Sequence, residues 1–136
     1  MCEVATVKTQ KTKDFIDVLA LTKDKIIIGK ASLSKHKTDK SFLWLHELEV
    51  HPLCRRQGIG SIIMDHVAEV AEKEKVDLVY AHPAPLEHTE GPQVSPRKLQ
   101  QFYRQQGFKP CVAPQDAVTV TDEGLLKRGM CLTIKK

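Results

Sequence analysis

The sequence contains no apolar run that approaches the roughly 20 residues a helix needs to cross a bilayer. Its first residues, Met1-Cys2-Glu3-Val4, have the features of neither a secretory signal peptide nor a myristoylation site. Aromatic side chains make up only 5% of the chain, and the net charge of +4 is spread without a run of one sign. We therefore expect a cytoplasmic protein that does not enter a membrane, and these features argue against a nucleic-acid partner.

The four cysteines, Cys2, Cys54, Cys111 and Cys131, lack the close spacing of a metal or redox site, and no C-x-x-C pair occurs. No ligand spacing is found among His51, His66, His82 and His88. We therefore expect no bound metal. Because cysteines of cytosolic proteins are usually reduced, we also expect four free thiols rather than disulfides.

Length and patterning favour one compact domain over residues 1–136, of mixed α/β class. Thr22-Lys23-Asp24-Lys25 is expected to be a tight turn, and Lys35–Ser41 a loop. Runs rich in β-branched and apolar residues predict eight strands, at Val4–Lys8, Phe15–Thr22, Ile26–Ser34, Phe42–Val50, Asp77–His82, Phe108–Val112, Val118–Thr121 and Met130–Ile134.

Two segments have helical signals. From Gly58 onward, apolar residues recur at steps of three and four and predict the longest helix. Ser95-Pro96 combines a capping residue with proline at the first helical position, and Gly107 supplies a C-terminal stop, so a second helix is expected between them. Pro83–Val94, with three prolines and a glycine, is expected to be a loop.

The segment that points to chemistry joins the fourth predicted strand to the first helix. It reads His51-Pro52-Leu53-Cys54-Arg55-Arg56-Gln57-Gly58-Ile59-Gly60-Ser61. Unpaired amides at a helix start, the helix dipole and two arginines suit an anion, and glycine lets a phosphate approach the backbone. The segment lacks both a G-x-x-x-x-G-K-[ST] motif and the third glycine of a dinucleotide site. A plain turn with solvated arginines is the alternative interpretation.

This segment resembles the R-x-x-G-x-G loop of the GCN5-related N-acetyltransferases, including the preceding V-x-P at Val50-His51-Pro52. Phe102-Tyr103-Arg104-Gln105-Gln106-Gly107-Phe108 resembles that family's F-Y-x-x-x-G-F motif. The two motifs and the strands between them span roughly residues 42 to 112. The resemblance implies a single domain of that fold, with a mixed, mostly antiparallel sheet that is flanked by helices and splayed where acetyl-CoA binds.

The resemblance also implies how acetyl-CoA is held. The backbone of Leu48 and Val50 is expected to pair with the pantetheine arm. The pyrophosphate is expected to bind the backbone amides of Arg55, Arg56, Gln57, Gly58, Ile59, Gly60 and Ser61, with Gly58 and Gly60 giving clearance.

The reaction implied is acetyl transfer from acetyl-CoA to a primary amine of a small molecule or a protein. His46 and Glu47 lie where the family often has its general base, and Tyr103 matches a tyrosine that protonates the departing thiolate. Strand alternation would send His46 and Glu47 to opposite faces, and a bulge could change which one reaches the cleft. The alternatives are a solvent-facing strand residue for one of the pair and plain helix packing for Tyr103.

Two departures from the family pattern concern the acceptor side. Pro96 replaces an asparagine that many relatives carry before the tyrosine. Only about six residues, Thr9–Asp14, separate the first two predicted strands, where relatives have one or two helices. The acceptor side is therefore expected to be open, or completed by Pro83–Val94 or by a second subunit in a homodimer. A coenzyme-binding sensor without catalysis and a toxin that acetylates aminoacyl-tRNA are the other functions considered.

Overall fold

The computed structural model describes residues 2–37, 41–82, 96–111 and 129–134. No helix in this described part is long and apolar enough to cross a membrane. In chain order its elements are β1 (Thr6–Lys11), β2 (Ile16–Leu21), β3 (Ile27–Lys37), β4 (Ser41–Val50), the 3₁₀ helix η1 (Pro52–Cys54), α1 (Ile59–Lys73), β5 (Leu78–Ala81), α2 (Pro96–Gln105), β6 (Lys109–Pro110) and β7 (Met130–Thr133).

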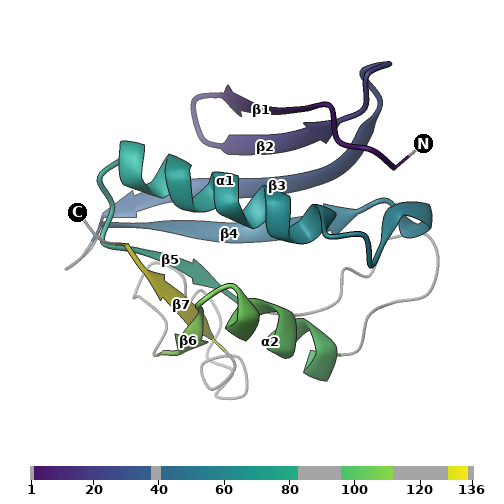
Figure 1. The fold of residues 1–136 in the computed structure, drawn as a ribbon. Helices are drawn as coiled ribbons and strands as arrows, with labels where there is room; N and C mark the ends of the chain where they lie inside the picture. The colour runs from purple at the N-terminus through teal and green to yellow at the C-terminus, as the bar shows by residue number, and fades with distance from the viewer. Residues whose placement is uncertain (1, 38–40, 83–95, 112–128, 135–136) are drawn as a thin grey trace.

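All the strands described belong to one seven-stranded sheet in the order β1-β2-β3-β4-β5-β7-β6. Every neighbouring pair is antiparallel except β4 and β5, which are parallel. Helix α1 lies across β2, β3 and β4. Helix α2 lies on the same side of the sheet and is drawn below α1 in Figure 1. The expectation of a mixed, mostly antiparallel sheet flanked by helices is confirmed.

The apolar stripe of α1 accounts for its position. Ile59, Ile63, Met64, Val67 and Ala71 are buried, and they join one core with residues of β2, β3 and β4. Full burial of an aliphatic side chain of this size contributes about 1.5–3 kcal/mol, so this stripe is enough to fix the helix against the sheet. The helix predicted from Gly58 is confirmed.

Helix α2 ends as its sequence predicts. Gly107 has a φ of 99°, and its amide donates to the carbonyl of Arg104 at 3.0 Å. The amide of Phe108 donates to the carbonyl of Tyr103 at 3.0 Å, so the last turn is closed by a left-handed glycine. The cap expected at Ser95, the loop at Pro83–Val94 and the strand at Val118–Thr121 lie outside the described residues.

Strand boundaries differ from the prediction in the first third of the chain. The loop expected at Lys35–Ser41 is shorter, because β3 continues to Lys37 and His36 pairs with Phe42 of β4. Pairing with a neighbouring strand thus outweighs the polar composition of this stretch. The tight turn at Thr22–Lys25 is confirmed by a bond of 2.9 Å from the amide of Lys25 to the carbonyl of Thr22.

The connection between β1 and β2 is a short turn at residues 12–15. The amide of Thr12 donates to the carbonyl of Phe15 at 2.9 Å, and the amide of Phe15 donates to Oγ1 of Thr12 at 3.2 Å. The two strands then pair directly, from Lys11 opposite Ile16 to Thr6 opposite Leu21. The expectation that helices are missing here is confirmed.

The expectation of four free thiols is wrong. Disulfides join Cys2 to Cys54, with Cα atoms 5.2 Å apart, and Cys111 to Cys131, with Cα atoms 5.8 Å apart. These pairs are separated by 52 and 20 residues, so no short spacing could reveal them. The sheet brings Cys111 close to Cys131, because β6 ends just before Cys111 and pairs antiparallel with β7, which contains Cys131.

Candidate functional site

Strands β4 and β5 lie side by side over only part of their length. Their parallel register runs from Phe42 opposite Leu78 to Leu45 opposite Ala81, where β5 ends, whereas β4 continues to Val50. Figure 1 shows the two strands diverging in the direction of both arrows. In the described part of the chain, no strand pairs with this edge of β4 beyond Leu45. We call this opening the splay.

The backbone of Leu48 and Val50 faces the splay. The amide of His51 donates to the carbonyl of Ile28 at 2.8 Å, so His51 faces β3. Because successive residues of a strand direct their N–H and C=O groups to alternate edges, Val50 and Leu48 face the opposite edge. An extended ligand could pair with them as an added strand does.

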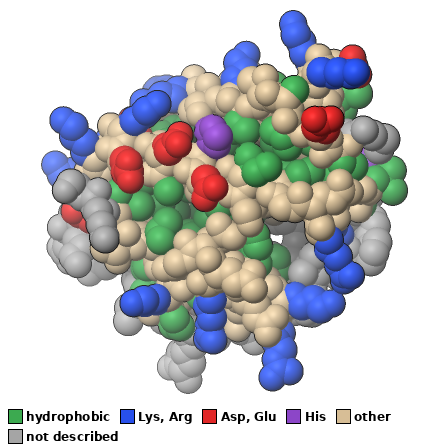
Figure 2. Space-filling view, viewed as in Figure 1, with side chains coloured by type: hydrophobic (Ala, Val, Ile, Leu, Met, Phe, Trp, Pro, Cys, Tyr) green, Lys and Arg blue, Asp and Glu red, His purple; other side chains and the backbone are tan. Residues whose placement is uncertain are grey.

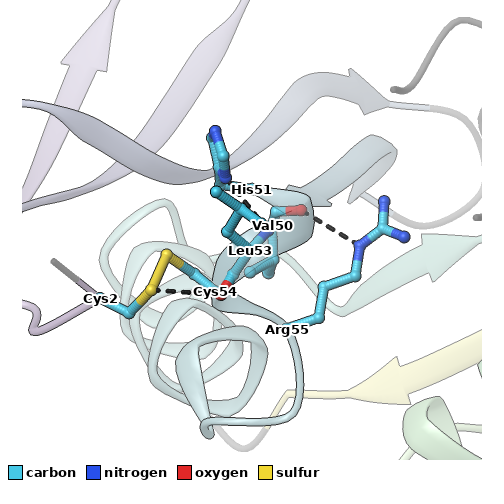
Figure 3. The surroundings of a disulfide bond; sticks show 6 residues. All are labelled: Cys2, Val50, His51, Leu53, Cys54 and Arg55. Carbon is cyan, nitrogen blue, oxygen red and sulfur yellow. Dashed lines mark hydrogen bonds between the residues drawn. A yellow bond between two sulfur atoms is a disulfide. The ribbon is translucent and has the colours of Figure 1, made fainter. Parts of the chain in front are cut away.

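One group at the splay already has a partner. Nε of Arg55 donates to the carbonyl of Val50 at 3.4 Å, and Figure 3 shows the side chain reaching back across the loop to make this bond. The bond ties the first arginine of the loop to the end of β4. A ligand in the splay would therefore meet the Arg55 guanidinium beside the Val50 carbonyl.

The loop that follows has two left-handed positions, Arg56 with a φ of 63° and Gly58 with a φ of 79°. No atom lies within 4 Å of a Cβ built on Gly58, so glycine is favoured here by its backbone conformation and not by lack of space. In the described residues, no backbone carbonyl accepts from the amides of Ile59, Gly60 and Ser61, which form the first turn of α1. Such amides, with the helix dipole, suit an anion.

Gly60 has a second role that the sequence did not reveal. A Cβ on Gly60 would lie 3.1 Å from Cζ of Phe102, so glycine here lets α2 pack against the start of α1. Nearby, Nε2 of Gln106 donates to Oγ of Ser61 at 2.9 Å. Two residues of the family-like motif, Phe102 in α2 and Gln106 just after it, thus hold the first turn of α1 in place.

The surface at this end of the molecule suits an anionic ligand. Figure 2 shows a hollow between the start of α1 and α2, with lysine and arginine side chains along one side of it. Arg56 is exposed and Arg55 is half-buried. Because arginine stays protonated at all relevant pH values, its charge is permanent.

The Cys2–Cys54 disulfide adjoins the same loop. Cys54 is the last residue of η1 and is fully buried, and Figure 3 shows the N-terminal segment joined to it beside Leu53. His51 caps η1 by accepting from the amide of Leu53 at 3.2 Å through Nδ1. The loop is therefore held at its start by a cap and a covalent link.

A β-bulge in β4 changes how His46 and Glu47 are displayed. Leu45 pairs with Leu33 of β3 and Glu47 pairs with Ser32, so His46 is the extra residue of β4. Ser32 and Ser34 alternate with the buried Leu33 and lie on the face of the sheet opposite α1, here called the second face. Glu47 shares that face through its pairing with Ser32. His46 shares it through a hydrogen bond to Ser34.

The bulge therefore corrects the expectation of opposite faces. Simple alternation would separate His46 from Glu47, but a bulge places two successive side chains on one side of the strand. Both residues then lie beside the splay. Past the bulge, Leu48 and Val50 return to the α1 side and pack against the core.

His46 is exposed to solvent, although its ring also packs against two aromatic side chains. Its centroid lies 4.3 Å from that of Trp44 and 5.8 Å from that of Phe15. The pKa of His46 is lowered from its ordinary value, mainly by burial and further by His36, while Glu47 acts in the opposite direction. The lowered pKa favours the neutral imidazole, which can accept a proton.

Tyr103 lies on the other side of the sheet from His46. It is 6% exposed, belongs to the same core as α1, and contacts Phe102 and Phe108 edge to face at 5.6 and 5.2 Å between centroids. Burial raises the pKa of the Tyr103 phenol well above its usual range. The phenol therefore keeps its proton and can donate it.

The expected site residues thus fall into two groups. Tyr103 and the start of α1 lie on the α1 side, whereas His46 and Glu47 lie on the second face beside the splay. The sequence analysis missed Ser34 and His36, which occupy alternate positions of β3 beside His46. Within the described residues, no group of three or more His, Cys, Asp or Glu side chains could hold a metal ion.

Comparison with known proteins supports the resemblance to GCN5-related N-acetyltransferases. The family model described as the acetyltransferase (GNAT) domain matches residues 15–110. No curated protein matches the chain.

The solved structures of similar fold include three acetyltransferases. A GNAT-family acetyltransferase from Staphylococcus aureus Mu50 is 18% identical, with a TM-score of 0.66 over 89% of this chain and 68% of that one. GCN5 from Tetrahymena is 16% identical, with a TM-score of 0.67 over 91% and 71%. The ribosomal-protein-S18-alanine N-acetyltransferase from Escherichia coli is 18% identical, with a TM-score of 0.60 over 93% and 73%. The family match spans well over half of the sequence, and the chain belongs to the GNAT acetyltransferase family.

Proposed function

We propose that this chain transfers an acetyl group from acetyl-CoA to a primary amine of a small molecule or a protein. The observation that carries the proposal is the splay, where the backbone of Leu48 and Val50 faces outward beside the uncapped first turn of α1. One surface thus offers strand-like hydrogen bonds for an amide-containing arm and helix amides for a pyrophosphate. Few ligands other than a coenzyme A thioester need both.

Donor binding is assigned to backbone groups. The amides of Leu48 and Val50 and the carbonyl of Leu48 would pair with the pantetheine arm. The amides from Arg55 to Ser61 would hold the pyrophosphate, supported by the permanent charges of Arg55 and Arg56. A backbone amide in the splay would also stabilise the negative charge that develops on the acyl oxygen.

The second face would receive the acceptor. An amine with a pKa near 10.4 is about 1 part in 2,500 neutral at pH 7, so a base near the attacking nitrogen is useful. We assign this role to His46, whose lowered pKa keeps the ring neutral, with Glu47 next to it. Glu47 would attract the protonated amine before that proton is lost.

The leaving group would receive its proton from Tyr103. As the nitrogen forms its bond to the acyl carbon, the carbon–sulfur bond breaks and the sulfur leaves as a thiolate. Burial keeps the Tyr103 phenol protonated until the sulfur leaves. Because the same burial makes the phenol a weaker acid, its proton would move only once the thiolate has formed. The phenolate is then reprotonated from solvent, and the amine's proton leaves by way of His46.

The name of the E. coli neighbour describes an alanine N-acetyltransferase, which is an example of an amine acceptor. We expect this chain to act in the cytoplasm.

The test is to measure acetyl-CoA binding by calorimetry and coenzyme A release with a panel of small amines, peptide N-termini and lysine peptides. We expect binding without an amine and release with at least one acceptor. Binding with no release from any amine would overturn the catalytic proposal in favour of a coenzyme sensor. Adding aminoacyl-tRNA to the panel identifies the toxin alternative, and failure to bind acetyl-CoA contradicts the whole proposal.

A further inference from the structure

The hydroxyl of Ser34 lies between two imidazole rings on the second face. Its Oγ is 2.6 Å from Nε2 of His46 and 2.7 Å from Nε2 of His36. Ser34 is 8% exposed and is the one buried polar residue among the described residues. The bulge in β4 creates this contact, since it turns His46 toward β3.

The two hydrogen bonds restrict the tautomers of the rings. A serine hydroxyl has one proton and two lone pairs, so it either donates to one Nε2 and accepts from the other, or accepts from both. Only the first arrangement links the two rings through a continuous chain of protons. If His46 is to accept a proton at Nδ1, its Nε2 carries hydrogen and donates to Ser34. Ser34 then donates to Nε2 of His36.

We propose that Ser34 and His36 form a proton relay behind His46, which carries the acceptor amine's proton away from the reaction centre. The proposal rests on the proposed function, because His46 is the base there. Ser34 and His36 touch neither substrate, and they act through His46 as positioning residues.

The transfer balances without another reagent. The amine's proton goes to Nδ1 of His46 as the nitrogen attacks, and the Nε2 proton of His46 moves to Oγ of Ser34. The original hydroxyl proton of Ser34 moves to Nε2 of His36. His46 ends neutral in its other tautomer and His36 ends as the imidazolium, which passes its proton to solvent.

Packing holds the rings of this relay in place. The His36 ring stacks on Phe42 at 5.1 Å between centroids with an interplanar angle of 18°, and it also lies 5.9 Å from the Trp44 centroid. Trp44 in turn contacts His46. Both imidazoles therefore pack against Trp44, which limits their rotation away from Ser34.

Other charged groups on this face affect the relay. By register, the titratable side chains that face it are Asp17 on β2, Lys30 on β3, Glu47 and Glu49 on β4, Tyr80 on β5, and His82, which follows β5. For His46, burial and the charge on His36 lower the pKa, whereas Glu47 raises it.

Kinetics with matched variants test the relay. We expect Ser34→Ala and His36→Gln each to lower kcat by tenfold or more at the alkaline plateau, where His46 is already neutral. Ser34→Thr keeps the hydroxyl and should stay within threefold of the parent. Ser32→Ala and His66→Gln are the matched controls, and neither should change kcat more than twofold. Plateau rates within twofold for Ser34→Ala and His36→Gln would overturn the relay.

The plateau separates the relay from simple electrostatics. If His36 acted only through its charge, His36→Gln would shift the acid limb of the pH profile and leave the plateau unchanged. Acetyl-CoA affinity and melting temperature, measured on each variant, show whether a lost rate reflects lost folding.

A measurement that needs no acceptor separates this proposal from the proposed function. Long-range ¹H–¹⁵N spectra of histidine-labelled protein should show opposite tautomers for His36 and His46, and Ser34→Ala should abolish that pairing. Identical tautomers in the parent protein would contradict the relay whether or not acetyl transfer is found. If the tautomers are opposite but the protein releases no coenzyme A, the proposed function has failed, and the catalytic role of the relay fails with it.

Discussion

Gly29 of β3 and Ile63 of α1 meet with no room for a side chain between them, since a Cβ on Gly29 would lie 2.6 Å from Cδ1 of Ile63. Ile63 is fully buried, and Gly29 pairs with Val50 at the end of β4. Glycine at this position fixes how closely α1 approaches the part of the sheet that borders the splay.

Gly29→Ala is therefore expected to lower the free energy of unfolding by about 1–3 kcal/mol, the usual cost of overpacking a core. Ile63→Val removes the Cδ1 atom that causes the clash. The double variant should lose less than the sum of the two single losses, as measured by chemical denaturation. Additive losses would show that the contact does not set the helix position.

Gly58→Ala tests the left-handed loop. The new methyl group would meet no atom within 4 Å, so only the φ of 79° opposes it. We expect a loss of about 1 kcal/mol in unfolding free energy, and weaker acetyl-CoA binding as the loop relaxes. Gly58→Asn should lose less, because asparagine adopts this conformation more readily. Equal affinity for all three proteins, measured by calorimetry, would remove Gly58 from the proposed phosphate site.

The pH dependence of turnover should report His46. A base works when it is unprotonated, so kcat should fall as the pH drops through the pKa of His46, which lies below the usual histidine value because of burial and His36. Rates corrected for the neutral fraction of the amine should be flat from about pH 7 upward. His46→Gln should remove the acid limb and lower the plateau by about 10²–10⁴-fold. An unchanged limb in that variant would shift the role to Glu47.

Tyr103→Phe removes the proposed proton donor with little change in shape. The ring would keep its packing between Phe102 and Phe108, so acetyl-CoA affinity should stay within about twofold. Turnover should fall at least tenfold, because the thiolate leaves without its proton. Single-turnover measurements separate this chemical step from product release. Unchanged turnover would refute the assignment.

Loss of the Cys2–Cys54 disulfide should affect both stability and the loop. Closing a loop of 52 residues stabilises a protein by up to about 4 kcal/mol in the chain-entropy model. We expect Cys2→Ser to lower the denaturation midpoint and to weaken acetyl-CoA binding. Cys111→Ser, which opens the 20-residue loop, should lower the midpoint without the same effect on binding. A peptide map with four free thiols in air-oxidised protein would contradict both disulfides.

Much of the fold could be predicted because its signals are local. The period of the apolar residues in α1, the glycine stop after α2 and the proline that ends β4 each act within a few neighbouring residues. The loop at Gly58 was found for the same reason, since its glycine and arginines lie together in the sequence.

The rest depends on contacts between distant segments. The bulge at His46 exists only in relation to β3, and Ser34 lies twelve residues away from it. The packing of Phe102 on Gly60 and both disulfides likewise join residues far apart in the chain. Composition and period carry no information on such pairs, so only the structure shows the surroundings of His46.

The bulge in β4 has a consequence for redesign. Trp44 and the bulge residue His46 lie on the second face, whereas Leu48 and Val50, which follow the bulge, lie on the core side. Side chains that would meet an acceptor can thus be exchanged without changing those packed beneath α1. A library confined to Phe15 and Trp44 would search for new amine specificity while leaving the proposed donor site unchanged.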